Sequence, residues 1–154
     1  MVIMSICWYS DEKLEIWFDK VPSLDIRFIL PDTSKDLANE IYEKPFICNE
    51  DLYVVLKDKI NSKTYGFLVQ KKYTWDGATI PRFFWRLIGS KTDNRFLVPS
   101  LIHDVLCENK DYIDYDRYFS TIVFERLLYV SKVNSFSRWA IKHSVDNFQK
   151  FCGW

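Results

Sequence analysis

Glycine, proline and closely spaced cysteines are all scarce in this chain of 154 residues. With only four glycines and five prolines, the chain lacks the glycine-rich loops that cradle phosphate groups and the long flexible linkers that join domains. Its four cysteines, Cys7, Cys48, Cys107 and Cys152, lie far apart in the sequence, which excludes a C-x-x-C zinc motif and argues against a disulfide framework. We therefore expect free, buried thiols in a reducing compartment.

An excess of positive charge is also missing, because 21 basic residues balance 21 acidic ones. Proteins that bind nucleic acid usually carry a basic patch that neutralises phosphate groups, so nucleic-acid binding is disfavoured. No apolar run approaches the roughly 20 residues that a membrane span needs. The first residues, MVIMSICWYSDEK, lack the basic start of a signal peptide, so we expect a protein that is not secreted by that route.

Aromatic residues, in contrast, are abundant and make up 18% of the chain. Aromatic rings bury a large area at a low cost in conformational entropy, which suits a small dense core or a protein interface. The length and the hydrophobic content of 48% are typical of one folded domain, so we expect residues 1–154 to form a single domain.

Strands are expected in the first half of the chain and helices in the second. Apolar β-rich segments predict strands at Val2–Tyr9, Leu14–Phe18, Leu24–Leu30, Asp51–Lys57 and Thr64–Lys71, with a hairpin turn at DKINSK. A cap at Thr33 or Ser34 predicts a short helix at Asp36–Tyr42, and Pro81 at a first helical position predicts one at Pro81–Ile88. Further helices are predicted at Pro99–Glu108, at Asp114–Val130, where apolar residues recur at helical spacing, and at Ser135–Phe151, with Ser135 as the cap. Strands followed by about four helices, without alternation, indicate an α+β fold with an N-terminal antiparallel sheet and a C-terminal helical cluster.

The polar residues His103, Asp104 and Asp116 are the first candidates for chemistry. His103 and Asp104 fall on opposite flanks of the apolar arc of their helix, so one of the two is expected to be a structural partner. Asp116 begins the apolar stripe of the next helix. Either it caps that helix, or it meets His103 or Arg82 in a buried network. Such a His–Asp pair orients an imidazole for base catalysis or metal binding, or satisfies a core histidine.

Three further polar candidates also have structural explanations. Asp76 precedes Gly77, and Asp-Gly strongly predicts a turn. Arg82 stands in a first helical turn, where the helix dipole disfavours a cation, so we expect it to have an acidic partner. His143 shares a stripe with residues expected to face inward, so we expect a hydrogen-bonded core histidine. Those residues are Phe136, Trp139 and Ala140, joined farther along by Phe148.

The sequences that mark well-known enzymes are missing. Phosphohydrolases named for a His-Asp doublet need a further histidine upstream, and none precedes His103. Secreted phospholipases combine their His-Asp helix with a glycine-rich calcium loop and a disulfide frame, and both are missing here. The G-x-S-x-G, H-E-x-x-H, P-loop and dinucleotide-binding motifs do not occur either.

Three motifs in order resemble a known family. YTWDGATIPRFFWRLIG (Tyr73–Gly89), LIHDVL (Leu101–Leu106) and DRYF (Asp116–Phe119) are similar to domain of unknown function family 1353, a group of short bacteriophage and prophage proteins. The resemblance covers residues 51–154 as a family-like core and leaves 1–50 as a β-rich part particular to this protein. It implies His103, Asp116 and Asp76 as catalytic or metal-binding candidates, and Arg82, Asp104 and Thr79 as binding candidates, without implying a reaction.

This resemblance implies a phage or prophage origin. We therefore predict a phage accessory or virion-associated protein, in the host cytoplasm or the virion, that binds other phage or host proteins. The sequence does not itself require a cofactor and leaves a divalent metal ion open. In this hypothesis the Asp/Arg/His set is a buried polar cluster that stabilises the fold. The alternative is a small hydrolase in which His103 is the general base, or in which Asp76, His103 and Asp116 hold a divalent metal ion.

Overall fold

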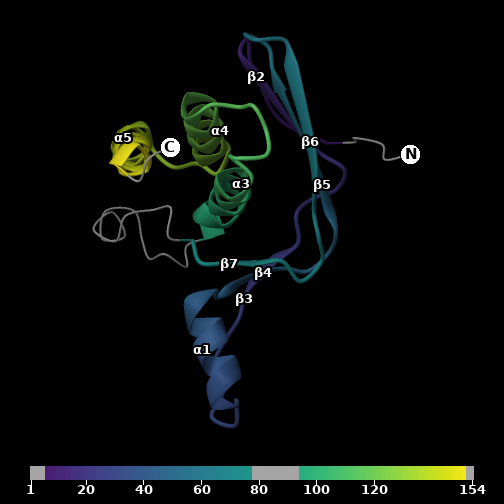
Figure 1. Ribbon diagram of the computed structural model, residues 1–154, viewed down its shortest axis with the longest axis vertical. Coiled ribbons are helices and arrows are strands. Elements are labelled where there is room, and N and C mark those ends of the chain that lie inside the picture. Colours follow the sequence, from purple (N-terminus) through teal and green to yellow (C-terminus); the bar gives the residue numbers. More distant parts are fainter. Residues whose placement is uncertain (1–5, 78–93, 152–154) are drawn as a thin grey trace. The chain divides into compact units, whose positions relative to one another are not determined.

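The computed structural model describes residues 6–77 and 94–151. It divides the chain into two compact units, Met1–Asp76 and Gly77–Trp154. The first unit contains antiparallel strands, and the second contains helices (Figure 1), which confirms the predicted α+β arrangement. The single domain expected from the length of the chain stays a prediction.

A four-stranded antiparallel sheet forms the main part of the first unit. Its strands are β1 (Ile6–Ser10), β2 (Leu14–Phe18), β5 (Leu52–Asp58) and β6 (Lys63–Val69), in the order β1-β2-β5-β6. Every second residue of β2 and of the first five of β5 is buried, because alternate side chains of a strand point to the same face. This periodicity explains why β2 coincides with its predicted strand, and why β5 and β6 lie close to theirs.

A smaller sheet joins three short strands, β3 (Leu24–Ile26), β4 (Phe46–Cys48) and β7 (Thr74–Trp75), in the order β3-β4-β7. The strand predicted at Leu24–Leu30 is wrong beyond Ile26, where the apolar pattern continues but the pairing stops. Its last three residues, Phe28, Ile29 and Leu30, are exposed. We did not predict β4 and β7, because two or three residues are too few to show the period of a strand.

Helix α1 (Lys35–Glu43) lies in the connection between β3 and β4. The Ser34 hydroxyl accepts a hydrogen bond from the Leu37 amide and caps the helix, as the sequence predicted. Only Ile41 is buried among the nine residues of the helix. Ile41 is therefore the main apolar contact of α1 with the rest of its unit.

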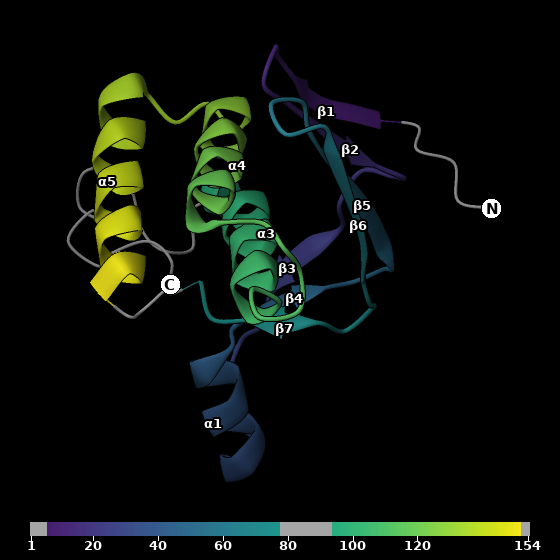
Figure 2. The same ribbon diagram turned by 45° about the horizontal axis from the view of Figure 1, so that its top comes forward.

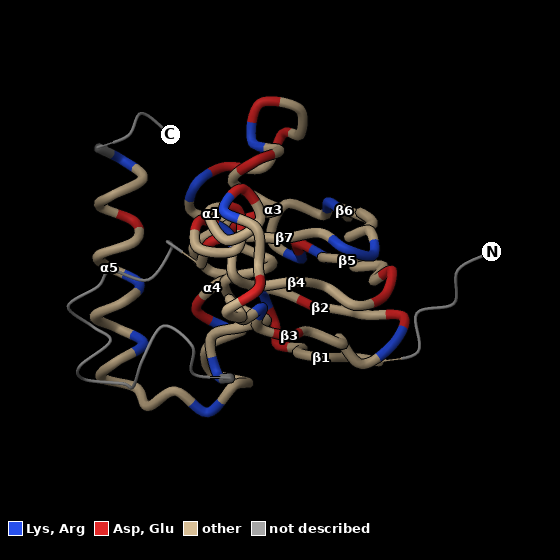
Figure 3. The backbone as a smooth tube through the Cα atoms, turned by 90° about the horizontal axis from the view of Figure 1, so that it is seen from below, with Lys and Arg blue, Asp and Glu red and all other residues tan. Residues whose placement is uncertain are grey.

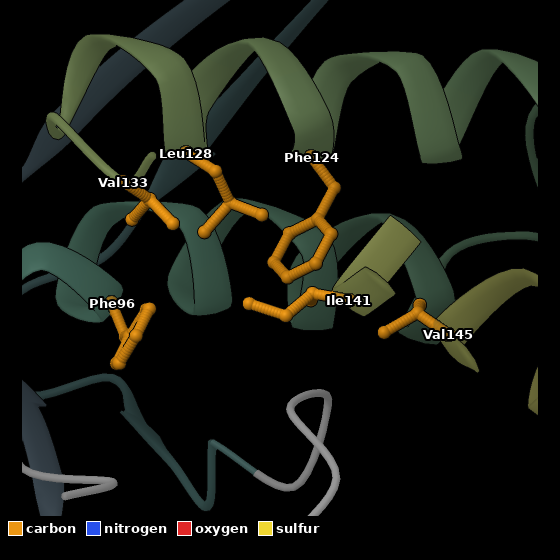
Figure 4. Close-up of a cluster of buried hydrophobic side chains, with 6 residues drawn as sticks. All are labelled: Phe96, Phe124, Leu128, Val133, Ile141 and Val145. Carbon is orange, nitrogen blue, oxygen red and sulfur yellow. The ribbon is translucent and has the colours of Figure 1, made fainter. Parts of the chain in front are cut away.

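The second unit contains a 3-10 turn, η2 (Asn94–Phe96), and the helices α3 (Leu97–Glu108), α4 (Arg117–Val130) and α5 (Ser135–Phe151). Helix α4 packs against both α3 and α5 (Figure 2). Buried apolar side chains from η2, α4, the α4–α5 loop and α5 form one cluster, shown in Figure 4: Phe96, Phe124, Leu128, Val133, Ile141 and Val145. The helix predicted at Pro81–Ile88 lies outside the described residues.

The buried face of α5 differs from the prediction. Ser137, Ile141, Val145 and Gln149, spaced by four residues, point inward and are buried, whereas the predicted inward residues Phe136, Trp139 and Phe148 are 67%, 60% and 64% exposed. Of the predicted set, Ala140 packs against the core cluster. The sequence of α5 has two stripes with apolar residues, and the one without aromatic side chains faces the core. The helix is also capped by Asn134, whose side-chain oxygen accepts from the Ser137 amide, rather than by Ser135.

Charged residues of both signs are interspersed along each unit (Figure 3). Within residues 6–77 and 94–151, no helix is both long enough and apolar enough to cross a membrane.

Candidate functional site

Helix α3 holds His103 in the interior of the helical unit. The apolar residues Leu101, Ile102, Val105 and Leu106 are buried along this helix, as predicted, and His103 is only 2% exposed. Its imidazole ring lies 4.9 Å from the ring of Phe124 on α4, measured between centroids. His103 is therefore a core residue, and Asp104, its neighbour in the doublet, is half-buried.

Two polar side chains contact the imidazole of His103. Gln149 of α5 places its side-chain nitrogen 2.9 Å from His103 Nε2 and donates a second hydrogen bond to Cys107 Sγ at 3.1 Å. Cys107, one helical turn after His103, has its sulfur 3.5 Å from His103 Nδ1. We call His103, Cys107 and Gln149 the polar trio.

Burial sets the protonation of the polar trio. It lowers the pKa of His103 to about 4. Burial also raises the pKa of Cys107 to about 12, and the charge of Asp104 adds to that effect. At neutral pH the ring is therefore neutral and the thiol is protonated. A cysteine nucleophile needs a thiolate, so this environment opposes the Cys–His catalysis that the proximity of the two groups suggests.

Asp116 has a different role. It is exposed, has extended backbone angles, and directly precedes α4. Its Oδ1 accepts a hydrogen bond of 2.7 Å from the Phe119 amide, which makes it the N-cap of that helix. The structure therefore shows the capping role that was one of the two alternatives. The hydrogen bond to His103 comes from Gln149, and Arg82, the other partner considered for Asp116, lies outside the described residues.

The remaining predicted site residues fall in different parts of the chain. Asp76 is half-buried and belongs to the first unit, whereas His103, Asp104 and Asp116 belong to the second. Gly77, which follows Asp76, has a φ of 68°, a left-handed conformation that suits the predicted turn. Thr79 and Arg82 lie outside the described residues.

A metal site was part of the alternative hypothesis. Among residues 6–77 and 94–151, no group of three or more His, Cys, Asp or Glu side chains is placed to hold a metal ion. The joint role of Asp76, His103 and Asp116 as ligands stays a prediction.

The prediction for His143 is wrong. It is exposed on α5, where its ring lies 4.9 Å from that of Trp139 in an edge-on arrangement. Trp139 is in turn stacked on Phe136 at 6.4 Å. The three rings form an exposed row on the side of α5 opposite the buried stripe, and we call this row the aromatic ladder.

Sequence reasoning missed Cys107 and Gln149. The four-residue spacing of His103 and Cys107 places both on one face of a helix, so their contact could have been expected. Gln149 continues the stripe of Ile141 and Val145 at the same spacing, which marks it as inward-facing. Its pairing with a residue 46 positions away could not be read from either pattern.

A protein-family model matches the part of the chain that contains His103 and Cys107. The model described as "Protein of unknown function (DUF1353)" matches residues 53–145. The chain belongs to this family. The DUF1353 match begins in β5, ends in α5 and includes Asp76, His103 and Asp116. It thus confirms the resemblance seen in the sequence.

One relative, described as "Uncharacterized protein y4jT" from Sinorhizobium fredii (strain NBRC 101917 / NGR234), is 33% identical over 67 residues. Those residues are 44% of this chain but only 18% of the relative, so that protein is several times longer than the part it shares. No solved structure matches the chain.

Proposed function

We propose that this DUF1353 protein is a phage or prophage accessory or virion-associated protein that acts by binding other phage or host proteins, in the host cytoplasm or the virion. The observation that carries the proposal is the burial of His103, which is 2% exposed and bonded to Gln149. A general base must reach its substrate, and among the described residues this imidazole contacts Cys107, Gln149 and Phe124 of its own unit. The polar residues of the helical unit therefore serve the fold.

The aromatic ladder supports an interaction role. Phe136 and Trp139 are 67% and 60% exposed, and large aromatic side chains are enriched at protein interfaces. Helix α5 already buries its other face within its own unit, so the ladder is available to a partner protein. We place the contact with that partner on Phe136, Trp139 and His143.

Two substitutions of Asp116 separate this proposal from the hydrolase alternative. If the carboxylate only caps α4, Asp116→Asn keeps an acceptor for the Phe119 amide and should lose no more than a few tenths of a kcal/mol, whereas Asp116→Ala should lose about 1 kcal/mol. Urea denaturation measures both losses. Elemental analysis of the wild type and of Asp116→Asn completes the test. Metal in the wild type and none in a fully folded Asp116→Asn would favour the hydrolase.

Association with virions tests the interaction role directly. Mass spectrometry of purified phage particles should detect the protein, and Trp139→Ser should reduce the amount while the variant remains folded. Tyr42→Ser removes an aromatic side chain that is 78% exposed on α1 and serves as the matched control. Equal losses for the two variants would contradict a binding role for the ladder.

A further inference from the structure

The two edges of the four-stranded sheet are built differently. At one edge, β1 has an irregular register with β2 between Cys7 and Tyr9, a bulge that disturbs regular pairing. At the other edge, β6 pairs with β5 in unbroken register over Lys63–Val69. Natural sheets protect their edges with bulges, prolines or charged residues. Strand β6 contains no proline and only one charged residue, Lys63, so its edge lacks this protection.

The hydrogen-bond pattern shows which groups of β6 face outward. The amide of Tyr53 donates to Asp19 and its carbonyl accepts from the Asp19 amide, so the backbone groups of Tyr53 point toward β2. The backbone N–H and C=O groups of successive residues point to opposite sides of a strand. Those of Val54, and of every second residue after it, therefore point toward β6. On β6 these residues of β5 pair with Phe67, Tyr65 and Lys63.

The other residues of β6, Thr64, Gly66 and Leu68, therefore turn their N–H and C=O groups away from the sheet. All three are exposed, and Leu68 is 45% exposed although its side chain is apolar. Each brings one donor and one acceptor that an added strand could satisfy.

We propose that β6 pairs with β6 of a second copy of this chain, antiparallel across a two-fold axis at Gly66. In that register Gly66 faces Gly66 of the second copy, and Thr64 faces Leu68, so the outward-facing donors and acceptors of both strands meet. Tyr65 lies opposite Phe67 on the other face of the strands. Lys63 lies opposite Val69, so like charges do not oppose each other. The pairing repeats each contact twice, as a closed two-fold dimer requires, and it joins two sheets into one of eight strands.

This dimer goes beyond the proposed function, because it uses the strand unit and does not depend on the aromatic ladder. Gly66 suits the axis, since its backbone is exposed and carries no side chain. A Cβ added there would meet Tyr53 Cε1 at 3.9 Å and the Val54 carbonyl oxygen at 4.0 Å, which is ordinary contact. Gly66→Ala should therefore fold and still dimerise.

Sedimentation equilibrium of the full chain, from micromolar to millimolar concentration, tests the proposal. The wild type and Gly66→Ala should form dimers. Gly66→Pro removes an outward N–H without removing a bond to β5, so the dissociation constant should rise at least about tenfold. Leu68→Lys places a charge on the same edge and should have the same effect even if Gly66→Pro fails to fold. Ile60→Lys, in the hairpin turn and 60% exposed, is the matched control and should remain dimeric.

A wild type that stays monomeric across this range would overturn the proposal, and so would a monomer whose β6 edge is found to bind a strand of another protein. Dimers of Leu68→Lys as tight as those of the wild type would overturn it as well. Thermal melts of each variant confirm that the compared proteins are folded.

Discussion

Replacing His103 tests the role of the polar trio through the dependence of stability on pH. The pKa of His103 is about 4 in the folded protein and near its ordinary value of 6.5 once the chain unfolds. Below pH 6.5 the unfolded chain therefore binds a proton that the folded protein does not. The free energy of unfolding contributed by this group is complete above pH 6.5 and is lost as the pH falls toward 4.

The size of the effect follows from the difference between the two pKa values. Each pKa unit corresponds to about 1.4 kcal/mol, so the wild type should lose about 3 kcal/mol through this residue by pH 4. His103→Gln cannot bind the proton and should lack this loss. Carboxylates also titrate in this range, but they are shared by the two proteins and cancel in the difference.

Urea denaturation of the wild type and of His103→Gln, at several pH values from 7 down to about 4.5, measures this difference in unfolding free energy. His143→Gln is the matched control, because the chain has two histidines and this one is exposed. Comparing the two substitutions separates the effect of the buried ring from the loss of a histidine side chain as such. Unfolding free energies of the wild type and His103→Gln that run parallel across the whole range would refute the assignment of His103 as a buried neutral base.

Three further outcomes are expected. Asp58 is 5% exposed and accepts hydrogen bonds from the amides of Ile60 and Asn61 in the β5–β6 turn, so Asp58→Ala should cost about 1–3 kcal/mol in urea denaturation; an unchanged stability would contradict it. Iodoacetamide should modify the exposed Cys7 well before Cys107, because burial keeps the Cys107 thiol protonated; peptide mapping measures the order, and equal rates would count against that environment. Asp146→Asn breaks the 2.9 Å ion pair with Arg117 and should cost up to about 1 kcal/mol, and less at high salt; a loss that salt does not change would argue against a charge effect.

Much of the fold could be predicted where the apolar pattern has a clear period. The alternation in LEIWF gave β2, and helical spacing gave α3 and α4, together with the cap at Asp116 as one of two alternatives. Predictions from the apolar pattern were wrong at the end of β3 and for the buried face of α5. Phe28 to Leu30 continue the alternation of β3, but no strand of the described residues pairs with them. Helix α5 has two apolar stripes, and only packing selects the one that is buried.

The candidate site was less predictable, because it depends on contacts between distant residues. His103 is a core residue through Gln149, and nothing local to either residue specifies the other. The doublet His103-Asp104 attracts attention as a catalytic motif, yet adjacent residues on a helix point in different directions. Helical periodicity places His103 and Asp104 equally far from the centre of the apolar arc. The position of α5, which supplies Gln149, decides that His103 is the buried one.

The single buried side chain of α1 has a consequence for local opening. A helix of nine residues is marginal in water, so its persistence depends on the packing of Ile41. Its amide protons should therefore exchange with solvent through fluctuations that leave β2 and β5 closed, at a free-energy cost well below that of global unfolding. The stretch between β3 and β4 would then be a natural point of entry for proteases on an otherwise folded chain.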